Sequence, residues 1–410
     1  MLQCKTKWKK KKLGNLGYTY SGLSNKTIDD FGSGEDFIPY MNIYKNSIIK
    51  IDKFEQVKIG LNEHQNQVQS GDVFFTTSSE TPEEVGLTSV LIDRIDKPLY
   101  LNSFCFGFRL NDNNEFNNTF LAYLLRGESV RLQISKMAQG STRYNLSKTQ
   151  LLNKLNLYYP NDKNEQEKIS RVLSTCDEVI EKTEETIEKY KQIKAGMMQD
   201  LFTRGLDENG KLRPTYAQSP DLYKYSKELD RHIPKEWDAK RLDEIATILS
   251  GKDYKGNPKG NYNIPIYGTG GIMGHTTIPL YSGPAILTGR KGSINTPYYV
   301  EGNFWNVDTI FCLKMLEDND ALWFYYQIYI TDMTKYNEAT GVPSTTTKTL
   351  NKILFAVPKP PEQMKIAESI IKFDKKIEVE EKYLNKYKQI KQGLMKRLLT
   401  PPVDAEIVEE

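Results

Sequence analysis

Two glycine-rich segments come closest to the sequence patterns that bind phosphate groups. The first, GTGGIMG from Gly268 to Gly274, approaches a dinucleotide-binding fingerprint, but Met273 stands where the third glycine is required. The second, GPAILTGRKGS from Gly283, has six steps between its first two glycines instead of five and lacks the GK[ST] ending. Neither segment predicts a nucleotide site, and hairpin turns explain the first equally well.

The histidines and cysteines are too scattered to form a reactive cluster. They are His64, His232, His275, Cys4, Cys105, Cys176 and Cys312. No CxxC or HExxH spacing occurs, so we expect no zinc site, no disulfide framework and no catalytic triad. The Asn-Pro-Pro-aromatic motif that an adenine methyltransferase would need is also missing from the sequence. The sequence therefore predicts no catalytic site.

The composition is that of a folded protein with two or three domains. The 410 residues are 38% hydrophobic and 27% charged, and the net charge is only +3. Any binding of nucleic acid would therefore depend on local basic patches. No run of about 18 apolar residues follows the basic start MLQCKTKWKKKK or occurs elsewhere. We expect a cytoplasmic protein without a membrane segment.

The chain contains two copies of one unit. The segment EQEKISRVLSTCDEVIEKTEETIEKYKQIKAGMMQDLFT from Glu165 aligns without a gap with EQMKIAESIIKFDKKIEVEEKYLNKYKQIKQGLMKRLLT from Glu362. The repeat extends upstream through the pairs Trp8 and Trp237, Leu13 and Leu242, Ser21 and Ser250, and Pro160 and Pro358. Each copy is thus expected to be a globular region followed by a long helix.

Both long stretches carry apolar residues at alternating spacings of four and three, the pattern of a coiled coil. The seams comprise Ile169, Leu173, Cys176, Ile180, Thr183, Ile187, Tyr190, Met197 and Leu201, and then Ile366, Ile370, Phe373, Ile377, Leu384, Tyr387, Leu394 and Leu398. We predict helices at residues 164–204 and 361–402 that pair with each other. The alternative is that each helix lies flat on its own globular domain.

Four seam residues could be taken for functional groups. Tyr190 and Tyr387 occupy heptad positions, so we expect them to pack in the seam. Lys194 and Lys391 replace apolar residues there, and we expect them to fix the register and orientation of the helices.

The globular regions mix strand and helix patterns, which predicts α+β domains at residues 1–163 and 235–360. Strand patterns are FIPYMNIY, GDVFFTTS and the alternation from Phe104 to Leu110, and then NIPIYG, GPAILTG and VDTIFCLKM. Helix patterns are NNTFLAYLLRGESVRLQISKMA and NDALWFYYQIYITDM. The polar residues 205–234 are predicted to be a linker, and residues 403–410 an acidic tail.

The order of these features, repeated twice, resembles the specificity subunits of type I restriction-modification systems. The features are an opening Trp and Leu, a Ser-Gly pair, a glycine followed by a polar run, a strand ending in proline, and EQxKI at the start of a long helix. The resemblance covers nearly the whole chain. It implies an internal tandem duplication in which two similar α/β target-recognition domains are separated by an antiparallel coiled coil of two long helices.

The resemblance also implies a function and partners. Each domain would read one half of a bipartite, asymmetric target in double-stranded DNA. Two modification (methyltransferase) subunits carrying S-adenosylmethionine would dock on the helices, and restriction subunits using ATP would join them. This chain would hold no cofactor and catalyse nothing.

Sequence-specific binding requires hydrogen-bonding side chains on exposed loops, because bases are read by donors and acceptors and phosphates by cations. The candidates in the first copy are Ser141, Thr142, Arg143, Tyr144, Asn145 and Lys148. Those in the second copy are Lys252, Tyr254, Lys255, Tyr267, Gly268, Thr269, Gly270, Arg290, Lys291, Ser293, Ser344, Thr345, Thr346 and Lys348. An isolated polar loop is more often a solvated turn. The cationic residues of GSTRYNLSK and TGRKGS favour DNA contact, whereas the run Lys9 to Lys12 is more typical of a solvated face.

Two other functions remain open at this point. The chain could be a coiled-coil protein-interaction scaffold without DNA specificity, in which case its DNA affinity would not depend on salt. It could also be the recognition module of a fused restriction enzyme-methyltransferase. The second alternative is less favoured because both long helices end, near Thr203 and Thr400, without a catalytic pattern following them.

Overall fold

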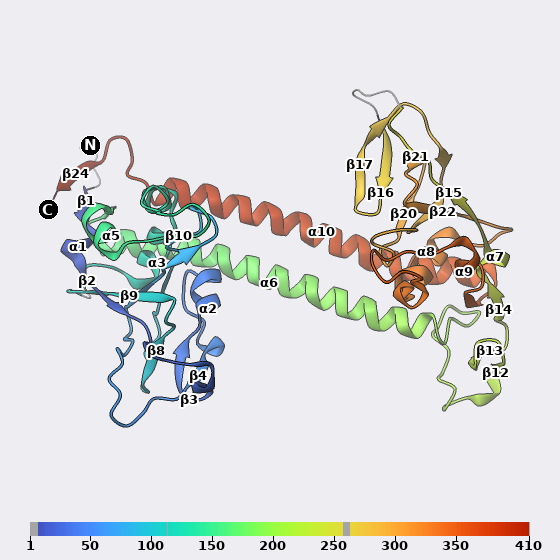
Figure 1. Cartoon of the computed structure of the whole chain (residues 1–410), viewed down its shortest axis with the longest axis horizontal. Helices are drawn as coiled ribbons and strands as arrows, with labels where there is room; N and C mark the ends of the chain where they lie inside the picture. Colours follow the sequence, from blue (N-terminus) through green and yellow to red (C-terminus); the bar gives the residue numbers. More distant parts are fainter. Residues whose placement is uncertain (1–6, 113, 257–262, 410) are drawn as a thin grey trace. The chain divides into compact units, whose positions relative to one another are not determined.

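The computed structural model describes residues 7–112, 114–256 and 263–409, which divide into two compact units. Unit 1 comprises Met1–Glu184 and Lys382–Glu410, and unit 2 comprises Glu185–Glu381. The division cuts both long helices, so each unit contains a globular region with one half of each helix (Figure 1). The helices therefore belong to the cores of the two units, although the sequence suggested that they were separate parts.

Unit 1 is built on an antiparallel sheet in the order β2-β9-β5-β7. These strands are β2 (Gly17–Ser21), β9 (Cys105–Leu110), β5 (Val73–Thr76) and β7 (Thr88–Val90). The central strand β5 is buried on both faces, with Phe75 in one apolar cluster and Phe74 in another. Helices α3 (Asn118–Arg126) and α4 (Glu128–Ser135) contribute to the Phe75 cluster. The helix predicted over this region is thus two helices, separated at Gly127.

The other face of this sheet packs near a second sheet in the order β4-β3-β8. The strands are β4 (Glu55–Val57), β3 (Phe31–Ile38) and β8 (Leu99–Leu101). The strand predicted from FIPYMNIY ends at Ile38, and helix α2 (Tyr40–Lys45) follows Pro39. Proline lacks the N–H that a strand ladder needs, so the chain leaves the sheet there. The smaller elements are α1 (Leu13–Leu16), α5 (Lys148–Lys154), β6 (Ser78–Ser79) and β10 (Tyr144–Asn145).

The predicted acidic tail is a strand. β24 (Glu406–Glu409) pairs in parallel with β1 (Lys7–Lys12), which also pairs with β11 (Asn156–Pro160). Lys10 Nζ lies 2.6 Å from Glu409 Oε1. Lys9 and Lys11 lie 3.6 and 3.3 Å from Glu115, so three lysines of the basic run lie beside a carboxylate. Opposite charges on neighbouring strands explain why this acidic segment is ordered.

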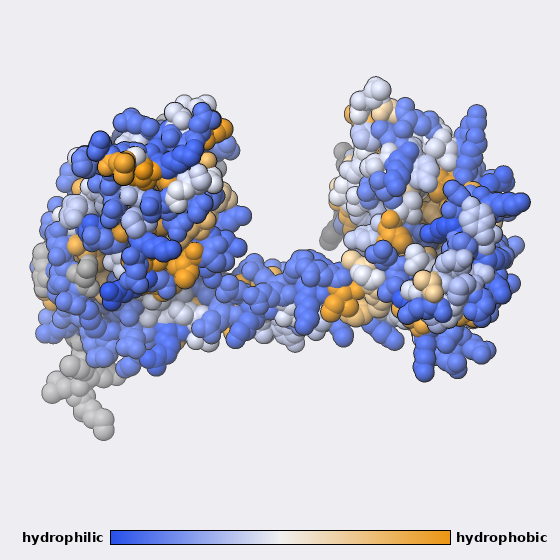
Figure 2. Space-filling model, turned by 90° about the horizontal axis from the view of Figure 1, so that it is seen from below, coloured by the Kyte–Doolittle hydropathy of each residue, from blue (hydrophilic) through white to orange (hydrophobic). Residues whose placement is uncertain are grey.

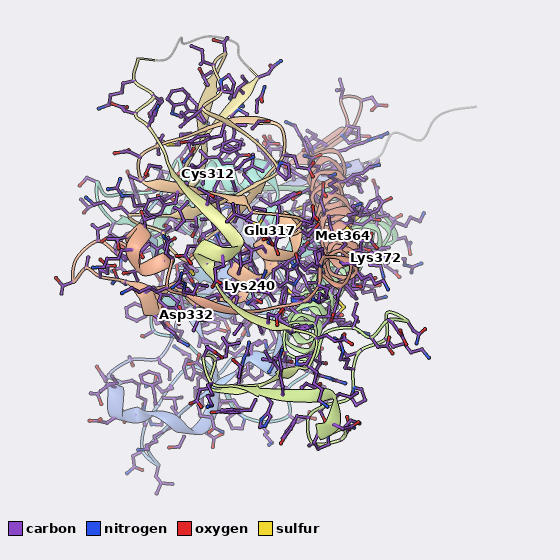
Figure 3. The ribbon with its side chains drawn as sticks, turned by 90° about the vertical axis from the view of Figure 1, so that its right-hand side faces the viewer. Lys240, Cys312, Glu317, Asp332, Met364 and Lys372 are labelled. Carbon is purple, nitrogen blue, oxygen red and sulfur yellow. The ribbon has the colours of Figure 1, made fainter. Side chains whose placement is uncertain are left out.

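Unit 2 repeats the main sheet of unit 1 in the order β15-β22-β19-β20. These strands are β15 (Ala246–Ser250), β22 (Ile310–Met315), β19 (Ala285–Gly289) and β20 (Tyr298–Val300). Cys312 is buried in β22, and Lys240 forms an ion pair of 3.9 Å with Glu317 after this strand (Figure 3). The equivalent strand order in both units shows that the duplication seen in the sequence is a duplication of the fold.

The remaining strands and helices of unit 2 surround this sheet. A second sheet runs in the order β17-β16-β21-β18, and a strand pair joins β14 to β23. Their bounds are β16 (Ile264–Gly268), β17 (Gly271–Thr276), β18 (Tyr281–Ser282), β21 (Asn303–Asn306), β14 (Asp238–Arg241) and β23 (Leu354–Val357). The helices are α7 (Leu242–Ile245), α8 (Ala321–Ile330) and α9 (Thr347–Leu350).

Residues 205–234, predicted to be a linker, are folded onto unit 2. β12 (Tyr223–Ser226) and β13 (Arg231–Pro234) form a hairpin. Leu206 and Ile233 are buried in the main core of unit 2, and Arg213 is only 7% exposed. The polar composition suggested a solvated tether, but a few apolar residues and one neutralised arginine are enough to hold this segment in place.

The long helices are α6 (Lys163–Leu201) and α10 (Pro360–Leu398), and a buried glutamine anchors the start of each. Gln166 donates to the Pro160 carbonyl at 3.0 Å and accepts from the N–H of Asn117, the N-cap of α3, at 2.8 Å. Gln363 makes the same contacts with Pro358 at 2.9 Å and with Asp320, the N-cap of α8, at 2.7 Å. The glutamine of EQxKI therefore fixes each long helix to the helix of its own domain.

The first turns of each long helix lie in the core of the preceding domain, and further along the helices pair with each other. Ile169 and Leu173 are buried in unit 1, and Ile366 and Ile370 in unit 2. Both expected packing modes therefore occur, in different parts of the seam. Within unit 2 the pairing is antiparallel, because residues 194 and 191 contact residues 374 and 381 respectively.

The lysines of the seam each bind an aspartate on the opposite helix. In unit 2, Lys194 lies 2.5 Å from Asp374, which also accepts a hydrogen bond from Tyr326 at 2.5 Å. Unit 1 repeats the cluster with Lys391, Asp177 and Tyr123. The lysine ammonium groups lie 5.2 and 5.3 Å from the centres of these tyrosine rings. Each cluster thus ties the helix pair to a domain, as expected for polar residues that specify register.

We expect the substitution Lys194→Met to destabilise unit 2 by about 1–2 kcal/mol, because it leaves Asp374 partly buried without its cation. Lys191→Met is the matched control, since its pair with Glu381 is about half exposed on both sides and should contribute about 0–1 kcal/mol. Urea denaturation measures both. Equal losses in the two variants would contradict the role given to the seam lysine.

Candidate nucleic-acid interface

Two of the polar loops chosen from the sequence are joined in unit 2. Lys291 and Ser344 form an antiparallel β-bridge. The N–H of Thr345 donates to the Arg290 carbonyl at 2.9 Å, and the N–H of Gly292 donates to the Pro343 carbonyl at 2.7 Å. The TGRKGS and GVPSTTTK segments are therefore one continuous surface, although about 50 residues separate them in the sequence.

The other glycine-rich loops of the second copy adjoin this junction. The N–H of Arg290 donates to the Thr309 carbonyl at 2.8 Å, and Tyr298 donates to the Thr269 carbonyl at 3.0 Å. A cavity of about 570 Å³ lies between residues 253–255, 268–273 and 307–309. All the candidate segments of unit 2 thus meet in one place.

The side chains at this junction fit a polyanion better than an apolar ligand. The exposed cations are Lys252, Lys255, Arg290, Lys291 and Lys348. Arg290 donates to the Asp308 carbonyl at 3.2 Å, which orients its guanidinium at the surface. Tyr254, Thr269 and Ser293 supply further hydrogen-bonding groups. The face of unit 2 seen in Figure 2 is mainly hydrophilic, with hydrophobic residues only in small groups.

Some of the residues chosen from the sequence serve the fold instead. Thr345 is only 4% exposed, and Gly268 is buried. Thr346 caps α9 by accepting from the N–H of Thr349, and its hydroxyl also donates to Glu338 at 2.9 Å. The ring of Tyr267 packs against the rings of Tyr298 and Phe304. The residue types alone could not distinguish these structural roles from exposed ones.

Unit 1 has the same junction with different side chains. The pairing of β10 with β6 joins the GSTRYNLSK loop to residues 78 and 79. Ser141, Thr142, Arg143 and Asn145 are exposed, and Arg143 donates to Ser78 Oγ at 3.1 Å. Tyr144 is half-buried.

Lys148 is poorly placed for a phosphate contact. It is half-buried, donates to Ser21 Oγ at 2.9 Å and lies 5.4 Å from the centre of the Phe106 ring. Burial lowers the pKa of its ammonium group. The side chain therefore joins the polar loop to the Ser-Gly pair at the end of β2.

The structure adds a loop of unit 1 that the sequence did not single out. The hydrogen bond from the N–H of Leu146 to the Thr77 carbonyl, 2.9 Å, matches that from Thr345 to Arg290 in unit 2. The segment Thr77 to Glu80 is therefore the counterpart of TGRKGS. Aligning the two copies on Thr76 and Gly289, the last residues of the equivalent strands β5 and β19, would have located it. The sequence pattern did not identify this loop because it carries hydroxyl residues, which are common in turns, where the second copy has cations.

Within the described residues, no group of three or more His, Cys, Asp and Glu side chains could hold a metal ion. Cys105 and Cys312 are buried, and burial raises the pKa of each thiol to about 12. Cys4 lies outside the described residues. None of the described helices is both long and apolar enough to span a membrane.

A protein-family model described as "Type I restriction modification DNA specificity domain" matches the chain twice, at residues 5–192 and 234–389. These matches include most of the sequence and fall once on each copy of the repeat. The chain belongs to this family. The resemblance noted in the order of sequence motifs, and the specificity-subunit function inferred from it, are therefore confirmed.

Curated relatives agree with this assignment. A putative type I restriction enzyme MjaX specificity subunit from Methanocaldococcus jannaschii is 24% identical over 323 residues, which are 70% of this chain and 69% of the relative. The MjaVIII specificity subunit of the same organism is 25% identical over 266 residues, or 58% and 59% of the two chains.

Solved structures of the family share the fold over nearly the whole chain. The crystal structure of a type I S subunit from M. genitalium has a TM-score of 0.60 at 19% identity, covering 98% of both chains. A chain from a study of complex assembly and conformational transition of the type I R-M system has a TM-score of 0.54 at 12% identity, covering 96% and 97%. The predicted fold class is thereby confirmed.

Proposed function

We propose that this specificity subunit supplies DNA sequence recognition and no catalysis, with each unit reading one half of a bipartite, asymmetric target in double-stranded DNA. The observation that carries the proposal is the loop junction that recurs in both units. In each unit, segments distant in sequence meet at the ends of equivalent strands and present exposed polar and cationic side chains. A rigid sheet behind such loops positions them for reading a groove.

The two junctions differ in the groups that they offer. The Arg290 and Lys291 loop of unit 2 corresponds to a loop of hydroxyl residues around Ser78 in unit 1, beside Arg143 and Asn145. Arginine favours guanine edges and asparagine favours adenine edges in the major groove, while exposed lysines favour phosphates. Two different sets of donors and acceptors support an asymmetric target.

We further propose that two modification subunits bind the long helices and bring S-adenosylmethionine, and that restriction subunits bring ATP. The helices expose apolar side chains that their own seam does not use, namely Val172, Val179, Ile193, Val379, Tyr383 and Ile390. A partner that covers the helices would bury these side chains. The subunit would act in the cytoplasm, where its DNA is.

The double variant Arg290→Ala, Lys291→Ala tests this proposal in the complex with modification subunits. If both side chains contact phosphate, the slope of log K against log salt concentration should fall by about 1.8, from about 0.9 for each contact. Fluorescence anisotropy with target DNA over a salt series measures the slope. Lys211→Ala with Lys227→Ala removes two exposed cations from residues 205–234 and should leave the slope unchanged. An unchanged slope in the first variant would contradict the interface, and no salt dependence in the parent would favour a scaffold.

A further inference from the structure

In unit 2 the glutamate of EQxKI, Glu362, forms a buried ion pair with Arg213. Arg213 approaches both oxygens of Glu362, at 2.5 and 3.1 Å. The same carboxylate accepts from the N–H of Leu206 at 2.8 Å and from the indole N–H of Trp237 at 3.1 Å. The side chains of Arg213 and Glu362 are only 9% and 11% exposed. Every hydrogen-bonding direction of this buried carboxylate is thus used.

The segment that covers this ion pair, which begins at Gly205, lies very close to Glu362 and Trp237. Gly205 has a φ of +64°, and a Cβ there would lie 2.2 Å from Glu362 and 2.4 Å from Trp237. Glycine is the residue that tolerates both the left-handed backbone and this contact. Residues 205–213 therefore contact the Glu362 carboxylate at three points, the backbone of Gly205, the N–H of Leu206 and the guanidinium of Arg213.

Unit 1 contains the same carboxylate and indole without the partner. Trp8 and Glu165 are the counterparts of Trp237 and Glu362 in the duplicated sequence. Trp8 is 2% exposed, and its buried indole N–H has no hydrogen-bond acceptor among the residues that the structure describes. Glu165 is half-buried, and its carboxylate has no hydrogen bond or ion pair with any described residue. Burial raises the pKa of Glu165, the neighbouring Asp162 carboxylate adds to the increase, and Lys168 offsets only part of it.

Among the described residues of unit 1, no arginine forms a hydrogen bond or ion pair with Glu165. Residues 399–409 follow α10 as residues 202–212 follow α6, but Pro401 and Pro402 stand where Arg204 and Gly205 stand in the first copy. Residues 406–409 pair with β1 and are acidic. Neither this segment nor residues 7–12 contain arginine. A buried N–H without an acceptor is rare in proteins and calls for an explanation.

We propose that Trp8 and Glu165 form a docking site for an arginine side chain of a modification subunit bound to unit 1. The guanidinium would bind Glu165 in the two-oxygen manner of Arg213, and the reoriented carboxylate would accept the indole N–H of Trp8. An arginine fits better than a lysine because its planar fork matches a carboxylate and is held with less loss of freedom. This inference rests on the proposed function, because it requires that modification subunits bind this chain.

The substitution Glu165→Gln tests the site, because it keeps the shape and removes the charge. We expect the affinity of the methyltransferase subunit for the chain to fall about 10- to 100-fold by isothermal titration calorimetry. Glu167→Gln is the matched control, since Glu167 is 53% exposed and pairs with Arg171 within its own helix. Trp8→Phe, which keeps an aromatic ring but removes the N–H, should weaken binding by a smaller factor.

Phenylglyoxal labelling identifies the arginine itself. One arginine of the modification subunit should be protected in the complex with the parent chain and reactive in the complex with the Glu165→Gln variant, as read by mass spectrometry. Equal affinity and equal labelling with both chains would overturn this inference and leave the proposed function standing. Failure of the parent chain to bind the modification subunit would overturn both. If Glu165→Gln destabilised the free chain as much as Glu362→Gln, a residue of the chain itself would fill the site, and the inference would be wrong.

Discussion

Replacing residues 235 to 360 by the equivalent region of a relative is expected to change one half of the DNA target and leave the other half unchanged. The reason is that the loops around Arg290 and Ser344 belong to unit 2, whereas those around Arg143 belong to unit 1. Mapping of methylated adenines in cells that carry the chimera and its partner subunits measures the outcome.

A matched control sharpens this experiment. The same chimera with residues 252–255, 268–273, 290–293 and 343–346 returned to the original sequence should recover the original target, because these segments form the junction. A change in both halves of the target, or a return of the original half without the loops, would rule out independent reading by the two junctions.

The second large effect concerns stability. We expect Arg213→Met to destabilise unit 2 by about 3–5 kcal/mol, since it leaves the buried Glu362 carboxylate without its cation. Unfolding in urea can be followed by the fluorescence of Trp237, Trp305 and Trp323 in unit 2 and of Trp8 in unit 1. The control is Glu165→Gln in unit 1, where the carboxylate has no described partner and the loss should be within about 1 kcal/mol. Similar losses in both variants would show that Arg213 does not neutralise a buried charge.

The long helices and the duplication could be predicted because their signals are local. Apolar spacing of four and three residues identifies a helix face wherever it packs, and the gapless repeat from Glu165 and Glu362 needs no structure to detect. The role of Lys194 and Lys391 could be predicted for the same reason, because each replaces an apolar residue of this local pattern. What the spacing could not reveal is that Ile169 and Ile366 pack into domain cores while the middle of the seam pairs helix with helix.

The parts that were missed depend on contacts distant in sequence. The strand formed by the acidic tail pairs Lys10 with Glu409, 399 residues away. The fold of the supposed linker depends on Arg213 and Glu362, 149 residues apart. Neither segment has a strong periodicity of its own, so a reading of local pattern assigned both to irregular structure.

The candidate interface was predicted in part. Glycine and cationic residues located the Arg290 loop, and hydrogen-bonding side chains located the loop around Arg143. Burial decides which of these groups face outward, and it placed Thr345 inside and Lys148 against the Ser-Gly pair. The counterpart loop at Ser78 was missed because hydroxyl residues are common in any turn.

The central claim is that this chain determines which DNA sequence its complex modifies, through two independent half-sites. The most direct test is a methylation map of a cell that carries this chain with its modification subunits, compared with the same cell lacking only this chain. The account predicts a single bipartite, asymmetric adenine-methylation motif that disappears when the chain is absent. A motif that persists without the chain, or the absence of any motif in its presence, would contradict the account.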